Sequence, residues 1–172
     1  MKIGFAGLEI ASDATVAPKE IAVWVAHTRQ ALSVDVADFL TAVYIIFRPA
    51  ISKYWPDERA CWNYMQRRDL PTDDRESQIR AAVEWLFPGS FEIPGTGFFG
   101  HVHGPEHWRA PVTETVLSLT AAARQMARAR GLEFTKIECV LLCLLENPVY
   151  GEGEALRASG IDTARLANAT VK

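Results

Sequence analysis

Long apolar segments and paired cysteines are both missing from this chain. None of its 172 residues belongs to an apolar run of the roughly 20 residues that cross a bilayer. Glu9 and Asp13 interrupt the apolar positions near the start, so no secretory leader is indicated. The cysteines number three and suggest no disulfide framework. We therefore expect a soluble, cytoplasmic protein without a membrane partner.

Catalytic motifs are also missing. The sequence has no phosphate-binding G-x-x-x-x-G-K-[ST] loop, nucleophile elbow, H-E-x-x-H or Cys-x-x-Cys. Carboxylates at residues 73–76 fall at an expected helix start, where the helix dipole accounts for them. Cys139 and Cys143 share a helix face, which permits a metal or redox pair, but their leucine-rich setting favours two buried hydrophobic residues. We expect neither enzymatic activity nor a cofactor.

Composition favours one globular domain that does not bind nucleic acid. Hydrophobic residues make up 49% of the chain, enough for one substantial core. The net charge of −3 argues against general nucleic-acid binding. The arginines at 124, 128 and 130 are interpreted as a solvated helix face.

The C-terminal part predicts four helices. Apolar residues recur at helical spacing from Val116 to Ala127, and Gly131 ends that helix. Thr135 and Glu138 have capping-box spacing, which predicts the start of a second helix that is apolar on every side up to Leu145. A short third helix around 152–159 should end at Gly160, and Asp162 should cap a fourth.

Residues 112–169 resemble one copy of the Clp N-terminal repeat, the binding module that precedes Clp family ATPases. The matching positions are Gly131, Phe134, Glu138, Leu141, Leu142, Leu144, Leu145, Leu156, Gly160, Ile161, Asp162 and Leu166. The sequence departs from the family where Gly-Thr becomes Lys136-Ile137, where His becomes Cys139, and where the following loop carries Pro148.

Such modules usually hold two repeats, and residues 18–86 show a weaker version of the pattern. Pro18 starts a helix that extends through Leu32; Ser33 or Asp35 caps a second that ends near Phe47; a third spans 60–65 and a fourth 73–86. An insertion occupies 48–57. The prediction is an all-α fold of about eight helices in two pseudo-repeated four-helix units packed as one domain. Its parts are an extension at 1–17, a first repeat at 18–86, a linker at 87–111 and a second repeat at 112–172.

The resemblance implies a protein-binding adaptor or accessory factor for a Clp-type unfoldase or protease. In the family, the groove between repeats and the start of each second helix receive adaptors or substrate tails, in some members phosphorylated arginine. Glu138 and Lys136 stand at that helix start here, although Ile137 replaces the family's Thr. The alternative is a stand-alone decoy that binds a small compound directed at the ATPase's own N-terminal domain.

Aromatic residues outside the apolar stripes are candidate anchors for a partner. They are Trp55, Phe98, Phe99 and Trp108. The simpler interpretation is that they fold back and are buried across the groove between the repeats. The linker also contains a G-x-G-x-x-G string at 95–100, which lacks the strand and helix of a dinucleotide site and is interpreted as a loop.

The linker also concentrates histidines. His101, His103 and His107 fall within seven residues, a spacing that permits a Zn²⁺ or Ni²⁺ site. A His-rich surface loop and a pH-sensitive hinge are the other interpretations. A metal-binding loop therefore remains a third functional hypothesis.

Overall fold

The computed structural model describes residues 13–28, 30–66 and 110–171. These residues form α2 (Ala17–Thr28), α3 (Val36–Ile51), the 3₁₀ turn η1 (Ser52–Tyr54), α4 (Glu58–Gln66), α6 (Glu114–Ala129), α7 (Ile137–Glu146), the 3₁₀ turn η3 (Pro148–Tyr150), α8 (Gly153–Ala158) and α9 (Thr163–Asn168). Within these ranges there is no strand, only an isolated bridge between Val34 and Val112. The all-α class is confirmed for the part of the chain described.

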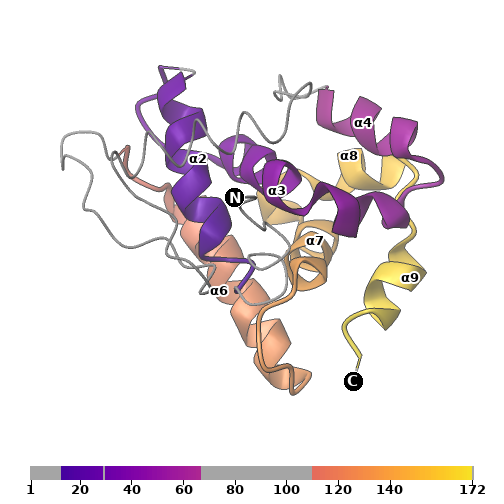
Figure 1. Cartoon of the computed structure of the whole chain (residues 1–172). Helices are drawn as coiled ribbons and strands as arrows, with labels where there is room; N and C mark the ends of the chain where they lie inside the picture. The colour runs from indigo at the N-terminus through magenta and orange to yellow at the C-terminus, as the bar shows by residue number, and fades with distance from the viewer. Residues whose placement is uncertain (1–12, 29, 67–109, 172) are drawn as a thin grey trace, which may run out of the picture.

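Two apolar helices, α3 and α7, form the centre of the fold (Figure 1). Each residue from Ile137 to Leu145 is buried, as is each from Asp38 to Phe47. On the outside, α2 packs on α3, and α6 packs on α7. The prediction that the helix up to Leu145 is apolar on every side and central is confirmed.

Several predicted helix ends are also confirmed. Gly131 and Gly160 follow α6 and α8 with φ of 65° and 82°, a conformation that glycine adopts without steric cost. The Asp162 carboxylate caps α9 by accepting the amide of Arg165 at 2.9 Å. Asp35 and Asp38 cap α3 reciprocally, each accepting the other's backbone amide at 2.9 and 3.0 Å.

The predicted capping box of Thr135 and Glu138 is wrong. Helix α7 begins at Ile137, and no side chain caps it. The Thr135 hydroxyl instead donates to Asp13 at 2.9 Å, and the Ala14 amide donates to the Thr135 carbonyl at 2.8 Å. The segment before α2 thus competes for the hydroxyl that would have capped α7.

The first half differs from prediction at two places. Helix α2 ends at Thr28, and Leu32, predicted as part of its apolar stripe, is 93% exposed. Helix α3 continues through Pro49 to Ile51 and leads directly into η1, so the predicted insertion at 48–57 begins as helix.

The two halves exchange backbone hydrogen bonds near their helix starts. Val34, before α3, donates to Pro111 at 2.9 Å and accepts from Thr113 at 3.0 Å, both before α6. Ala14, before α2, bonds Thr135, before α7, as described above. The predicted helix at 73–86, most of the predicted linker at 87–111 and the start of the 1–17 extension lie outside the described residues.

Candidate binding pocket

A pocket of about 500 Å³ lies where α7 begins. One wall is the end of α3 with η1, and the opposite wall is the loop that leads into α7. The lining residues are Ala14, Phe47, Ala50, Lys53, Leu132, Glu133, Phe134, Thr135, Lys136, Ile137, Glu138 and Ala169. This volume falls in the range of pockets that bind a small molecule. Because α7 begins here, its dipole adds partial positive charge to the pocket.

Glu138 lines the pocket, and its side chain is already engaged. The residue is 8% exposed; its Oε1 accepts the Tyr54 hydroxyl at 2.5 Å and lies 3.8 Å from the Lys53 ammonium. Burial, reinforced by the hydrogen bond to Glu138, raises the pKa of Tyr54, so the phenol keeps its proton and remains a donor. The hydroxyl and the ammonium together offset the cost of burying a carboxylate.

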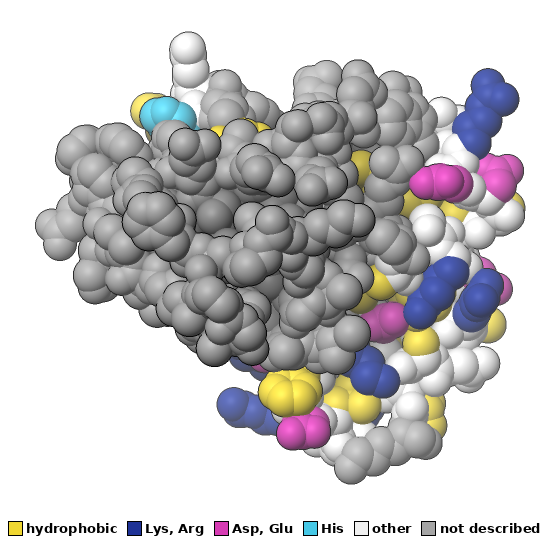
Figure 2. All heavy atoms as spheres, in the orientation of Figure 1, with side chains coloured by type: hydrophobic (Ala, Val, Ile, Leu, Met, Phe, Trp, Pro, Cys, Tyr) yellow, Lys and Arg dark blue, Asp and Glu magenta, His cyan; other side chains and the backbone are white. Residues whose placement is uncertain are grey.

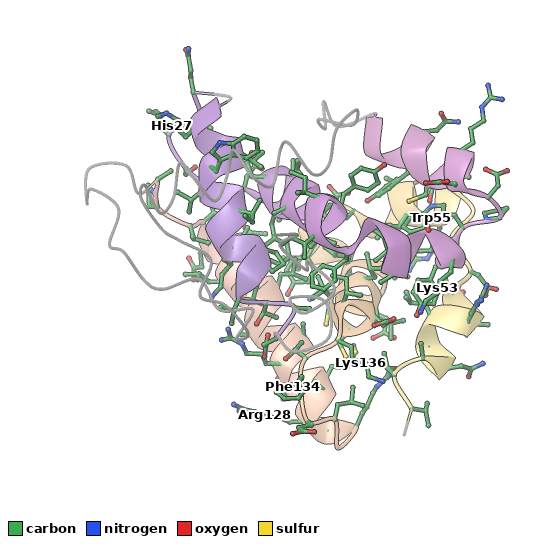
Figure 3. All side chains as sticks on the ribbon, viewed as in Figure 1. His27, Lys53, Trp55, Arg128, Phe134 and Lys136 are labelled. Atoms are coloured by element: carbon green, nitrogen blue, oxygen red, sulfur yellow. The ribbon has the colours of Figure 1, made fainter. Side chains whose placement is uncertain are left out.

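Lys136 and Phe134 lie on the rim of the pocket. Lys136 is exposed, and its ammonium donates to the Ala169 carbonyl at 3.2 Å. The Phe134 side chain is 47% exposed. Figure 3 shows Arg128, Phe134, Lys136 and Lys53 in this order along one edge of the molecule.

Sequence reasoning placed Lys136 and Glu138 here but did not select Lys53, Tyr54 or Phe134 as site residues. Lys53 and Tyr54 lie in the region interpreted as an insertion, where no periodicity assigns a face. Phe134 was identified only as a position shared with the Clp repeat. The sequence feature that could have identified Phe134 is a large apolar residue in a short loop between two helices, where burial is not expected.

A smaller hollow of about 310 Å³ shares residues 132–135 with the first and contains a hydrogen-bond network around Asp13. Asp13 accepts the Thr15 hydroxyl, the Thr15 amide at 2.8 Å and the Thr135 hydroxyl. The Arg124 guanidinium donates to the Thr15 hydroxyl at 2.8 Å. Burial alone would raise the pKa of Asp13, but the Thr15 and Thr135 hydrogen bonds and the Arg124 charge outweigh it and lower that pKa.

This network corrects the interpretation of the three arginines as a solvated face. Arg124 and Arg130 are half-buried, and only Arg128 is exposed. Arg124 joins α6 to the segment before α2 and so has a structural partner.

Trp55 is not the exposed anchor that the sequence predicted. It is 4% exposed, its indole N–H donates to the Ser159 hydroxyl at 2.8 Å, and its ring centroid lies 5.8 Å from that of Tyr64. A buried indole whose polar group finds a hydrogen-bond partner is typical of a core position. The other predicted anchors, Phe98, Phe99 and Trp108, and the glycine string at 95–100 lie outside the described residues.

The cysteines on α7 have the character of buried hydrophobic residues. Cys139 and Cys143 are both free and buried, and burial raises the pKa of both thiols, that of Cys143 to about 11. Both thiols are therefore protonated near neutral pH, whereas a nucleophile or a metal ligand would need to be a thiolate.

The predicted metal ligands His101, His103 and His107 lie outside the described residues. Over residues 13–28, 30–66 and 110–171, no three His, Cys, Asp or Glu side chains are grouped so that they could hold a metal ion. In the same ranges, no helix has both the length and the apolarity needed to cross a membrane.

Comparison of the chain with protein-family models, with curated proteins and with solved structures finds no match.

Proposed function

We propose that this chain is a non-catalytic protein-binding module of the Clp N-terminal type, an adaptor or accessory factor for a Clp-type unfoldase or protease. The pocket at the start of α7 carries the proposal. It lies between α3 of the first half and α7 of the second, and the resemblance implies that adaptors or substrate tails bind at such a position. Lys136 and Glu138, selected for this role from the sequence, both line it.

The order of elements supports an internal duplication. A long outer helix, an apolar central helix, a 3₁₀ turn and a further helix follow one another as α2, α3, η1 and α4, and again as α6, α7, η3 and α8. Each 3₁₀ turn ends in a buried tyrosine, Tyr54 or Tyr150.

The hydrogen bonds between the halves are reciprocal in the same sense. The segment before α2 bonds to the segment before α7 through Ala14 and Thr135. The segment before α6 bonds to the segment before α3 in the same direction, because the Thr113 amide donates to the Val34 carbonyl at 3.0 Å. Two repeats related by an approximate twofold axis would make the same contact twice, once from each repeat. The pattern therefore favours a Clp-type double repeat.

The chemistry of the pocket fits binding better than reaction. Its buried carboxylate is held by Tyr54 and Lys53, and the nearby Cys139 thiol is protonated by burial. Phe47, Ala50 and Ile137 supply apolar surface to an incoming side chain.

The second candidate is a small-ligand decoy, and the pocket volume of about 500 Å³ is the observation that favours it. This function predicts that a compound which binds Clp N-terminal domains raises the melting temperature of the chain in the absence of any Clp partner.

Affinity capture from lysate of the source organism tests the proposal. The immobilised baits are the wild type, Ala50→Phe, which fills the pocket from α3, and Arg59→Gln, a control on α4 away from the lining residues. We expect a Clp ATPase or peptidase with the wild type and the control, and its loss with Ala50→Phe. Melting temperatures establish that each bait is folded. Absence of Clp components from all three samples would reject the adaptor function in favour of the small-ligand candidate.

A further inference from the structure

We infer that the segment bound at this pocket is acidic and carries one apolar side chain. The inference rests on the proposed function and specifies the chemistry of its partner. Three observations support it, namely the charge around the pocket, the state of the buried carboxylate, and the apolar surface that adjoins both.

Positive side chains lie at and beside the opening. Lys53 and Lys136 line the pocket, and Arg128 lines the adjoining hollow. Arg165 lines neither, but it donates to the Lys53 carbonyl at 2.8 Å; all four residues are exposed. Figure 2 shows Lys and Arg side chains at separate points along the right and lower edges of the visible face, with hydrophobic and acidic side chains among them. We call Lys53, Arg128, Lys136 and Arg165 the cationic rim.

The carboxylates near the rim offset only part of this charge. Among the described lining residues they are Asp13, Glu133 and Glu138. Asp13 is matched by Arg124 and two threonines, and Glu138 by Lys53 and Tyr54. Of the exposed lining residues that remain, Arg128 and Lys136 outnumber Glu133 by one charge, so this surface is weakly positive although the whole chain has a net charge of −3. An acidic segment is its electrostatic complement.

The engaged state of Glu138 argues against a cationic guest. A guanidinium or ammonium group that entered the pocket would compete with Tyr54 and Lys53 for the Oε1 atom of Glu138, which leaves Glu133 as the exposed carboxylate of the lining. Like-charge repulsion with Lys53 and Lys136 would add to the cost of binding such a group.

The apolar surface favours a peptide. Phe134 is 47% exposed between Arg128 and Lys136 (Figure 3), and Phe47, Ala50 and Ile137 line the adjoining pocket. A leucine-sized side chain gains free energy by leaving water for this surface. A phosphate backbone gains nothing from it, and a nucleic acid would have to stack a base on Phe134 instead. The geometry thus favours an acidic peptide with one apolar anchor.

Fluorescence anisotropy with the full chain tests the inference. The probes are short labelled peptides with one central Leu flanked by Asp and Glu, by Ser and Gln, or by Lys and Gln, and the acidic peptide with Leu replaced by Ser. We expect the acidic Leu peptide to bind most tightly, with an affinity that falls as salt is raised. Replacing its Leu with Ser should weaken binding to the wild type but make little difference to Ala50→Phe.

The double variant Arg128→Gln, Lys136→Gln should weaken the acidic peptide roughly five- to tenfold, because two exposed charge pairs are lost. These two residues are chosen because neither pairs with the buried Glu138. The matched control, Lys19→Gln with Arg59→Gln, removes the same charge from α2 and α4 and should leave affinity unchanged.

Neutral or basic peptides that bind as tightly as the acidic one would overturn the inference, as would equal losses in both double variants. Equal competition by a single-stranded oligonucleotide would also overturn it, by revealing a general anion site. In each of these cases, capture of a Clp component on the wild type would leave the proposed function standing. If no Clp component were captured either, the inference and the proposed function would both be rejected.

Discussion

At the scale of single residues, the pocket depends on how one carboxylate is accommodated. Glu138 is placed by the first turn of α7 against Tyr54 and Lys53, which arrive from η1 in the other half of the chain. The hydrogen bond and the ion pair therefore join the two halves and also shape the pocket wall. A carboxylate buried with only one of these partners would be destabilising.

Replacing Tyr54 with Phe should lower the free energy of unfolding by about 1–3 kcal/mol, because a buried carboxylate loses its short hydrogen bond. Urea denaturation measures the change. Tyr150→Phe is the matched control, since its hydroxyl lies 3.4 Å from that of Ser118 in a half-exposed position, and it should cost less than about 1 kcal/mol. Equal losses in the two variants would show that the Glu138 contact contributes little.

Asp13 makes the stability of the folded chain depend on pH in the acid range. Its pKa is lower in the folded chain than the ordinary value of 3.8, so its contribution to stability is complete above that value and is lost as pH falls through the folded pKa. Wild-type stability should therefore decline below about pH 4 more steeply than that of Asp13→Asn. Thermal melts across acid pH give the comparison, and parallel curves for the two proteins would contradict this role.

At the scale of helices, the sequence predicted α6 to α9 well because each has a local signal. Apolar spacing locates α6 and α7, Gly131 and Gly160 end α6 and α8, and Asp162 starts α9. Local signals failed where a distant segment supplied a better partner. The Thr135 hydroxyl bonds Asp13, and Trp55 bonds Ser159, so capping and exposure at these positions are decided by tertiary contacts.

The junction of α7 and α8 is closely packed at Gly153. A Cβ atom there would lie 2.8 Å from the Leu144 carbonyl oxygen and 3.0 Å from that of Leu145. Gly153→Ala should destabilise the protein by about 1–3 kcal/mol, because backbone must shift to accept the methyl group. Glu154→Ala, on the exposed side of the same helix, should change stability by less than about 0.5 kcal/mol. An unaltered melting temperature for Gly153→Ala would mean that the two helices are not packed this closely.

At the scale of the whole molecule, the all-α class was predictable from periodicity, but the way the halves interlock was not. The contacts of Ala14 with Thr135, Val34 with Pro111 and Tyr54 with Glu138 all join residues far apart in the chain. Such pairs leave no periodic pattern, and only the resemblance to a repeated module indicated that the halves should meet. The cationic rim escaped prediction for the same reason, since its residues come from α6, η1, the loop before α7, and α9.

This interlocking predicts that the two halves unfold together. Helical circular dichroism and tryptophan fluorescence should report one urea transition, and Val140→Ala in the second half should shift both signals by the same amount. Trp55→Phe, which removes the indole bond to Ser159, should shift them together as well. Separate transitions for the two signals would show that the halves fold independently.

Site-specific photocrosslinking tests most directly whether partner proteins bind at the start of α7. A photoreactive phenylalanine analogue replaces Phe134 on the pocket rim or, as the control, Arg59 on α4, and each protein is irradiated in lysate of its source organism. We predict that position 134 crosslinks to a Clp ATPase or peptidase, that position 59 does not, and that an excess of the acidic Leu peptide suppresses the product. Equal crosslinking from both positions, or none to a Clp component from position 134, would contradict the proposed binding site.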